Sequence, residues 1–257
     1  MKIAIIGAGA MGGAIADGIL NKGVIPAADL IISNHTSGKL ARFSESGATL
    51  TTNNREAVAK ADWVILAVKP WLVEDVLDEF HDLLTEEKTL ISVAAGVNAA
   101  DLGIWTNKVP RLFIAIPNIA IAQGASMTFL TPINEFEKTK DEVVRFFNSM
   151  GKTCVCNESQ LQAGMALASC GIAYAFRYIR AASEGGVELG FKAYQAQEIV
   201  MQTLMGAVAL LEADNLHPEE AIDQVTTPGG YTIKGLNAME QAGFTNAVIQ
   251  GLLASMK

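Results

Sequence analysis

The sequence contains few cysteines, no basic run and no long apolar stretch, and each shortage excludes a class of protein. Its three cysteines are Cys154, Cys156 and Cys170. An odd number does not suit a disulfide framework, and Cys154 and Cys156 alternate along a predicted strand, which is poor spacing for zinc. We therefore expect buried, reduced thiols in a cytoplasmic protein, and no metal site.

Charge and hydropathy exclude further classes. The formal net charge of −8 argues against a nucleic-acid-binding surface. The sequence also lacks a basic patch interleaved with aromatic residues, which such a surface would need. A transmembrane helix needs about eighteen consecutive apolar residues, and the sequence has no such run. The N-terminus reads as a structural strand, so we expect neither a signal peptide nor a membrane partner.

The opening segment is the most informative part of the chain. Residues 2–6 form an apolar run typical of a buried parallel strand, and Gly7-Ala-Gly9-Ala-Met-Gly12 follows directly. In this motif Gly7 permits a tight turn, Gly9 lets the backbone approach a pyrophosphate, and Gly12 allows close packing of the next helix. The free N–H groups of that helix then favour a phosphate.

The pattern of strands and helices predicts two domains, residues 1–157 and 158–257. In the first, helical segments at 11–20, 55–61, 73–84 and 134–150 alternate with strands, which predicts an α/β fold with a parallel, doubly wound, Rossmann-type sheet. The predicted strands are 2–6, 30–33, 63–68, 89–93, 112–116, 127–130 and 153–156.

The second predicted domain is all-helical. Its segments are 160–188, 194–213, 218–224, 231–241 and 245–256. Segment 160–188 is too apolar for a helix with one buried stripe, which suggests that a second subunit covers it. We therefore expect a dimerisation domain and a homodimer, or a larger homo-oligomer built from dimers.

Polar residues after the predicted strands indicate the cofactor. The second strand ends in Asn34 and His35, with Lys39 a few residues later, and lacks the Asp or Glu that usually binds the adenosine ribose of NAD. These groups suit a 2′-phosphate and favour NADPH, with NADH possible; the alternative is that His35 and Lys39 are ordinary surface residues. Lys69 follows the third predicted strand in the same way.

A second glycine motif lies in the helical half. Thr226-Thr227-Pro228-Gly229-Gly230-Tyr231-Thr232 precedes a predicted helix, and glycines followed by a helix N-terminus offer backbone N–H groups to an anion. A plain helix-joining turn is the alternative. The surplus of hydroxyl groups favours a carboxylate site.

Over essentially its whole length the chain resembles the pyrroline-5-carboxylate reductase family, the cyclic-imine reductases of proline biosynthesis. The resemblance rests on the first glycine motif, Ala67-Val-Lys-Pro70, Pro117-Asn118, and most specifically Pro228-Gly-Gly-Tyr-Thr232. It implies a Rossmann domain followed by a helical dimerisation domain, and reduction of 1-pyrroline-5-carboxylate to L-proline by NADPH or NADH.

The resemblance also implies site residues. Thr232 would be catalytic, as a hydrogen-bond donor near the ring nitrogen. The residues expected to bind the small cyclic imino acid are Glu158, Thr227, Gly229, Gly230 and Tyr231. The residues expected to bind the cofactor are Gly7, Gly9, Ala10, Met11, Gly12, Asn34, His35, Asn54, Ala67, Val68, Lys69, Pro70, Ala95, Gly96 and Asn118.

Several positions depart from the family pattern. The family segment Arg-x-Met-Pro-Asn-Thr-Pro appears as 114–120, and Ser-Gly-Ser-Gly-Pro-Ala-Tyr appears as 168–174. Tyr231 replaces a small residue, and His35 replaces an arginine, which removes a bidentate phosphate ligand. Two alternatives therefore stay open: an imine reductase with another cyclic substrate, and a non-catalytic NADP-binding sensor or partner protein. A β-hydroxyacid dehydrogenase is disfavoured, because segment 160–188 lacks that family's catalytic lysine.

Overall fold

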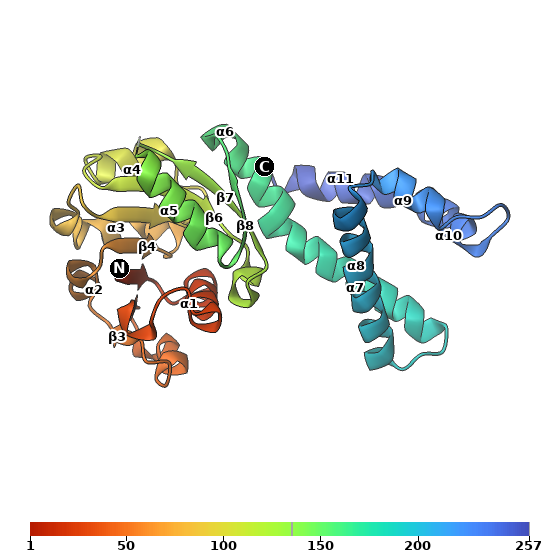
Figure 1. The fold of residues 1–257 in the computed structure, drawn as a ribbon, viewed down its shortest axis with the longest axis horizontal. Helices are drawn as coiled ribbons and strands as arrows, with labels where there is room; N and C mark the ends of the chain where they lie inside the picture. Colours follow the sequence, from red (N-terminus) through yellow and green to blue (C-terminus); the bar gives the residue numbers. More distant parts are fainter. Residues whose placement is uncertain (135, 257) are drawn as a thin grey trace. The chain divides into compact units, whose positions relative to one another are not determined.

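A computed structural model of the chain describes residues 1–134 and 136–256 and divides into two compact units (Figure 1). The first unit runs from Met1 to Ser169, and the second begins at Cys170. Glu135, inside a predicted helix, and Lys257, the end of the second predicted domain, lie outside the described residues. The domain boundary predicted after residue 157 stays a prediction. The two compact units meet later in the chain, between Ser169 and Cys170.

Within the described residues, the first unit is built on an eight-stranded sheet with the order β3-β2-β1-β4-β5-β6-β7-β8. Its strands are β1 Ile3–Ile6, β2 Leu30–Ser33, β3 Thr49–Thr51, β4 Trp63–Leu66, β5 Thr89–Ser92, β6 Arg111–Ile116, β7 Ser126–Pro132 and β8 Gly151–Val155. Its α-helices are α1 Ala10–Lys22, α2 Asn54–Lys60, α3 Val73–Asp78, α4 Ala99–Trp105, α5 Glu137–Asn148 and α6 Glu158–Gly164.

Helices cover both faces of this sheet, which confirms the doubly wound, Rossmann-type fold. Successive strand residues point to opposite faces, so Ile3 and Ile5 join one buried cluster while Ala4 and Ile6 join another. The first cluster contains residues of α1 and α5. The second contains residues of α2, α3, α4 and α6. The core therefore lies in two layers on either side of a buried sheet.

The sheet is parallel, as expected, except at one pair of strands. β6 and β7 pair antiparallel, with Ile114 opposite Thr131, while β8 pairs parallel with β7. The connection between β6 and β7 contains only a short 3₁₀ helix, Ile119–Gln123. A parallel crossover needs a dozen or more residues, so this connection returns the chain antiparallel.

Two short elements were absent from the sequence-based prediction. β3 has one partner, β2, and none of its residues is buried, so it carries no apolar pattern. The N-cap of α4 is Asn98, whose side chain accepts a hydrogen bond from the Asp101 N–H at 2.8 Å. That cap was a readable signal, because Asn followed three residues later by an acid is common at helix starts.

The segment predicted as one helix over 160–188 is interrupted. It consists of α6, a π-helix from Met165 to Cys170, and α7 from Gly171 to Glu188. The loop after β6 contacts the π-helix, since the Ser169 hydroxyl donates to the Pro117 carbonyl at 2.9 Å and the Asn118 amide donates to the Ala168 carbonyl at 3.4 Å. These bonds give a physical reason for the altered winding, and π-turns of this kind are frequent near functional sites.

The three cysteines are free thiols, as predicted, but they are half-buried rather than buried. Cys154 lies on β8, the edge strand of the sheet, where only one side has a neighbouring strand. Burial raises the pKa of the Cys156 thiol above its ordinary value. A raised pKa disfavours the reactive thiolate.

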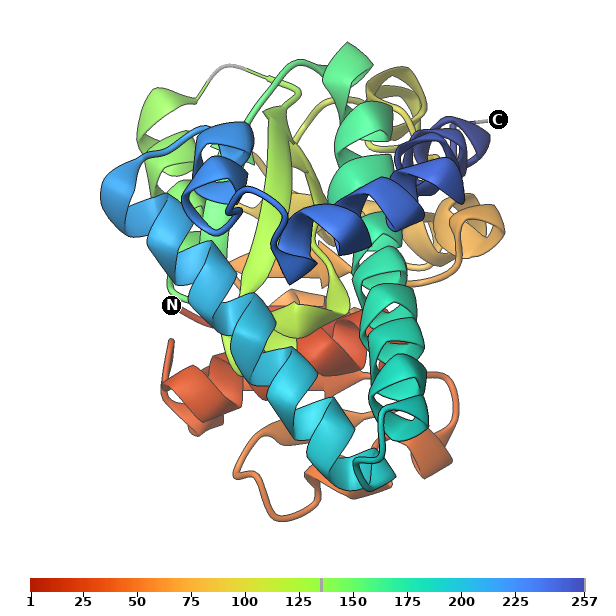
Figure 2. The same ribbon diagram turned by 90° about the vertical axis from the view of Figure 1, so that its right-hand side faces the viewer.

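The second unit is helical throughout its regular elements, which are α7, α8 Ala193–Asp214, α9 Pro218–Gln224, α10 Tyr231–Gln241 and α11 Phe244–Ala254. Figure 2 shows α7 and α8 joined as a hairpin. They approach closely where a Cβ on Gly186 would lie 2.8 Å from Ala196 Cβ. Tyr174 links α7 to α11 by donating to the Gly251 carbonyl at 3.0 Å.

No single helix among the described residues is both long and apolar enough to cross a membrane. In the same described part of the chain, α8 and α9 taken together reach the required length and composition, but this pair is bent by 112°.

We expect Gly18→Ala to lower the free energy of unfolding by about 1–3 kcal/mol through overpacking. A Cβ at Gly18 of α1 would lie 2.4 Å from the Ile121 carbonyl oxygen and 3.0 Å from the Met150 sulfur. Gly13→Ala on the same helix is the matched control, because the nearest atom to its Cβ would belong to the Arg42 guanidinium, at an ordinary contact distance of 3.4 Å. Urea unfolding compares the two variants, and an equal loss in both would contradict the packing explanation.

Candidate functional site

The first glycine motif forms a turn in which each glycine has a separate role. Gly7 adopts φ of +104°, and a Cβ there would lie 2.7 Å from the Ala67 carbonyl oxygen. A Cβ at Gly12 would lie 1.9 Å from the Gly7 carbonyl oxygen. At Gly9, by contrast, a Cβ would meet nothing within 4 Å, because this residue lines an open cavity. Gly7 and Gly12 therefore permit close packing, and Gly9 leaves room for a ligand.

The N-terminus of α1 opens the same cavity to an anion. Gly9 is the N-cap residue, it has no side chain to cap the helix, and the first turn contains no acidic residue. The first N–H groups of a helix have no partner within it, and the helix dipole places partial positive charge there. A phosphate is the ligand that such a terminus favours.

The cavity has a volume of about 630 Å³ and lies at the carboxyl ends of β1, β2 and β4, where ligands of doubly wound sheets bind. Most of the residues predicted to bind the cofactor line it together. These are Gly7, Gly9, Ala10, Met11, Asn34, His35, Asn54, Ala67, Val68, Lys69, Pro70 and Ala95.

Three predicted cofactor residues do not line this cavity. Gly12 packs under the glycine turn, where a Cβ would lie 1.9 Å from the Gly7 carbonyl oxygen. Gly96 lines a separate cavity of about 330 Å³. Asn118 is 8% exposed, and its side chain caps the following 3₁₀ helix by accepting from the Ala120 N–H at 3.0 Å.

Asn34 connects the glycine turn to the loop after β2. Its side-chain oxygen accepts a hydrogen bond from the Ala8 N–H at 3.0 Å, and its amide nitrogen donates to the Thr36 carbonyl at 2.9 Å. His35, Thr36 and Lys39 line the cavity beside it. This end of β2 therefore presents amide, hydroxyl, imidazole and ammonium groups, and no carboxylate from β2 itself.

One wall of the cavity was missed by the sequence analysis. Leu72, Asp75, Val76 and Glu79, all on or next to α3, line it. Their spacing of three and four residues places them on one helix face. The sequence therefore showed that these four residues would lie together. The sequence did not indicate which helix face would border the cavity.

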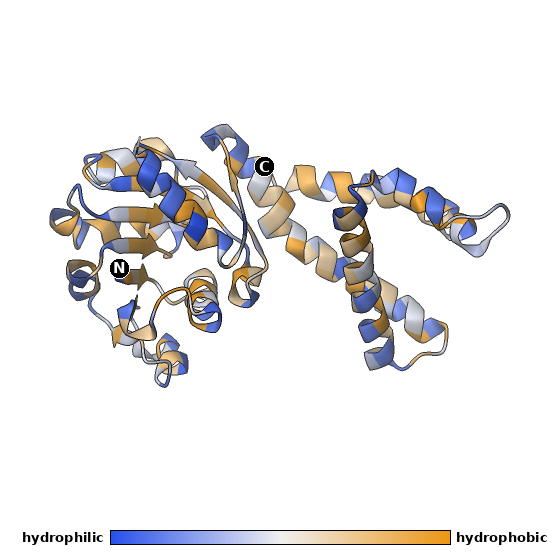
Figure 3. Cartoon of the chain, viewed as in Figure 1, coloured by the Kyte–Doolittle hydropathy of each residue, from blue (hydrophilic) through white to orange (hydrophobic). Residues whose placement is uncertain are grey.

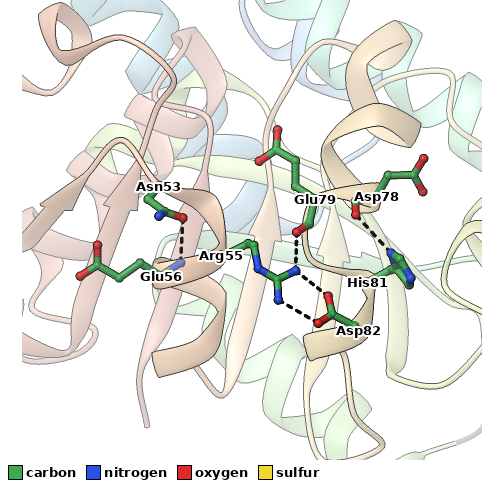
Figure 4. A network of polar contacts seen from close by, with 7 residues as sticks. All are labelled: Asn53, Arg55, Glu56, Asp78, Glu79, His81 and Asp82. Atoms are coloured by element: carbon green, nitrogen blue, oxygen red, sulfur yellow. Dashed lines mark hydrogen bonds and ion pairs between the residues drawn. The ribbon is translucent and has the colours of Figure 1, made fainter.

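A polar network holds this wall to α2 (Figure 4). The Arg55 guanidinium donates to both carboxylate oxygens of Asp82, at 2.6 and 2.8 Å, and to the Glu79 carbonyl at 2.7 Å. The hydrogen bond from Arg55 holds the pKa of the Asp82 carboxyl below its ordinary value, so the pair persists above about pH 4 and is lost as pH falls through the lowered pKa.

The smaller cavity, about 330 Å³, lies at the carboxyl ends of β5 and β6. Gly96, Asn98, Ile116 and Glu158 are among the residues that line it. The Glu158 carboxylate accepts a hydrogen bond from the Ala99 N–H at 2.7 Å, at the start of α4. Glu158, which was predicted to bind substrate, therefore holds the end of the loop after β5 through this hydrogen bond.

The second glycine motif forms a turn that ends in a bare helix N-terminus. Gly229 adopts φ of +71°, and the Gly230 N–H donates to the Thr227 carbonyl at 2.9 Å. Gly230 caps α10 with no side-chain hydrogen bond and no acid in the first turn. Tyr231 is 94% exposed, and Thr232 is also exposed. Free N–H groups beside a hydroxyl form a suitable site for a carboxylate.

Two family models match the chain. Residues 2–96 match the NADP oxidoreductase, coenzyme F420-dependent family, and residues 158–257 match the pyrroline-5-carboxylate reductase dimerisation family.

Known proteins resemble the chain over its whole length. Pyrroline-5-carboxylate reductase 1 of Dictyostelium discoideum is 37% identical over 98% of this chain, which spans 48% of that protein. Pyrroline-5-carboxylate reductase 2 of the same organism is 33% identical over 99% of this chain and 90% of its own length. The crystal structure of Plasmodium falciparum pyrroline carboxylate reductase with NADP bound gives a TM-score of 0.92 at 25% identity, covering 100% of this chain and 95% of that one.

We expect Asn34→Ala to lower the free energy of unfolding by about 1–3 kcal/mol, because the Ala8 N–H loses its acceptor in a partly buried turn. Asn34→Asp is the matched variant, since a carboxylate keeps an acceptor for that N–H and should restore most of the stability. Thermal or urea unfolding measures both. Wild-type stability in Asn34→Ala would show that the bond does not support the turn.

Proposed function

Since the chain belongs to the pyrroline-5-carboxylate reductase family, we propose that it reduces 1-pyrroline-5-carboxylate to L-proline with NADPH, the last step of proline biosynthesis. The observation that carries this proposal is the full-length match to a pyrroline-5-carboxylate reductase at 33% identity, covering 90% of that protein. The free α1 terminus in a cavity of about 630 Å³ supports it.

The residues present fit a dinucleotide phosphate. The α1 terminus and Gly9 hold the pyrophosphate, because the N–H groups are free and the space beside Gly9 is open. His35, Thr36 and Lys39 hold the 2′-phosphate through one imidazole, one hydroxyl and one ammonium group. When bound, the cofactor supplies a hydride. NADH fits the same cavity without that phosphate.

The remaining predicted cofactor residues complete this assignment. Asn34, Asn54, the Ala67–Pro70 segment and Ala95 all line the cavity. In this proposal the first three would lie beside the ribose and phosphate groups, and Ala95 toward the nicotinamide. Gly12, Gly96 and Asn118 act through the backbone that they position, because they lie outside the main cavity.

The turn before α10 holds the substrate carboxylate. In this proposal its ligands are the backbone N–H groups of Gly229 and Tyr231 and the Thr227 hydroxyl. Gly230 shapes the turn, because its own N–H donates to the Thr227 carbonyl, and Glu158 acts through the loop that it caps. On hydride transfer to the imine carbon, the C=N π electron pair would become a lone pair on nitrogen, which would take up a proton from solvent. The Thr232 hydroxyl donates a hydrogen bond to that nitrogen and stabilises the charge that develops there.

The protein works as a homodimer, or as a larger homo-oligomer built from dimers. Among the described residues from Cys170 onward, Ala196 alone is buried, while side chains such as Leu189, Met205 and Leu253 are 83%, 59% and 54% exposed. Figure 3 shows hydrophobic residues along α7, α8 and α11. A helical unit that buries so little needs a second copy to cover it. The free thiols fit the reducing cytoplasm.

A second candidate function is reduction of a larger cyclic imino acid. The supporting observation is Tyr231, whose ring is 94% exposed at the start of α10, directly beside the proposed carboxylate turn. A side chain of this size in place of a small residue changes the shape of the site next to the substrate ring.

The test of the proposed function is NADPH oxidation by the purified protein with 1-pyrroline-5-carboxylate, with NADH and a six-membered cyclic imino acid in parallel. Rapid oxidation with the five-membered ring supports the proposal. Oxidation with the six-membered ring alone supports the second candidate. Cofactor binding without oxidation of any imine would instead identify a non-catalytic NADP-binding protein.

We expect Thr232→Ala to lower kcat by about ten- to a hundredfold, the low end for removing one positioned donor. Thr245→Ala is the matched control, because its hydroxyl donates to Glu240 within the same unit and lies outside the proposed site. Steady-state kinetics with saturating NADPH measures both variants. Unchanged kcat in Thr232→Ala would exclude the proposed role of its hydroxyl.

A further inference from the structure

The cofactor cavity contains a carboxylate that comes from α3 rather than from the strand where dinucleotide sites usually carry one. Glu79 directly follows α3 and lines the cavity together with Asn34, His35 and Lys39. In sites of this fold, an Asp or Glu near the end of the second strand accepts a hydrogen bond from the ribose 2′-hydroxyl. β2 ends at Ser33 and is followed by Asn34, and neither residue offers a carboxylate.

Two consecutive residues of α2 hold Glu79 in place. The Asn54 amide nitrogen donates to the Glu79 carboxylate at 2.8 Å, and the Arg55 guanidinium donates to the Glu79 carbonyl at 2.7 Å. Arg55 is itself fixed by its two hydrogen bonds to Asp82 (Figure 4). The side chain and the backbone of Glu79 are therefore both anchored to the same helix.

Hydrogen-bond chemistry fixes the orientation of the groups between Glu79 and β2. An ionised carboxylate only accepts, so the Asn54 NH₂ group must face Glu79 and its carbonyl oxygen must face Ser33. The Ser33 hydroxyl then donates to that oxygen, at 2.7 Å. Ser33 is fully buried at the end of β2. Two hydrogen bonds in series thus connect the Glu79 carboxylate to the end of β2, where the ribose of a dinucleotide lies.

We propose that Glu79 is a cofactor-selectivity residue that accepts a hydrogen bond from the adenosine ribose of NADH and opposes the 2′-phosphate of NADPH. This inference rests on the nucleotide site of the proposed function. The balance between the two cofactors is then set by the Glu79 carboxylate acting against the Lys39 ammonium and the His35 imidazole. Asp75, a residue of α3 that also lines the cavity, adds to the same negative potential.

The test is fluorescence titration of the full-length protein with NADPH and with NADH, which gives a Kd for each. We expect Glu79→Gln to lower the ratio of the NADPH Kd to the NADH Kd by about five- to tenfold, the effect of removing one charge near a phosphate close to the surface. The shift should shrink at about 0.5 M salt, because exposed charges are screened.

Two further variants serve as controls for that result. Asp78→Asn changes the charge equally, at an exposed neighbouring residue that does not line the cavity, and should leave the ratio unchanged. Lys39→Gln removes the opposing charge and should raise the ratio. Both variants are measured under the same conditions as Glu79→Gln.

An unchanged ratio in Glu79→Gln would overturn the inference. So would equal weakening of both nucleotides, which would make Glu79 only a support for Asn54. Measuring turnover separates this inference from the proposed function. If the Kd values shift as expected but no imine is reduced, the selectivity role of Glu79 stands and the proposed reductase activity is wrong.

Discussion

The close approach of α1 to the end of β1 is the constraint on which the nucleotide half of this protein depends. Gly12 lies so near the Gly7 carbonyl that a single methyl group would sit 1.9 Å from its oxygen. Further along the same helix, Gly18 lies against the Ile121 carbonyl in the same way. With both contacts in place, the free N–H groups of α1 open directly into the cavity.

The rest of the cavity is assembled around that helix terminus by polar contacts between elements distant in sequence. Asn34 attaches the glycine turn to the loop after β2, and Asn54 joins β2 to the end of α3. Each of these side chains uses both ends of its amide, one as acceptor and one as donor. The amides therefore fix the relative position of three loops without placing an unpaired charge in the cavity.

The helical unit is built on a different principle. Its helices contact one another through small residues, such as Gly186 against Ala196, and leave most large apolar side chains exposed. An apolar groove of about 490 Å³, lined by Tyr178, Phe244 and Val248 among others, runs between α7, α10 and α11. In the proposed dimer this surface provides the driving force for association, so the stability of the unit depends on protein concentration.

The sequence by itself determined the features that depend on local backbone chemistry and periodicity. The buried strands, the glycine turn with its helix, the change to an all-helical second half and the turn before α10 all follow from residue order. The tertiary structure alone decided the antiparallel β7, the π-helical break before α7 and the placement of Glu79 beside Asn54. These three depend on which distant groups meet, and a one-dimensional pattern of apolar and polar residues contains no information on such pairings.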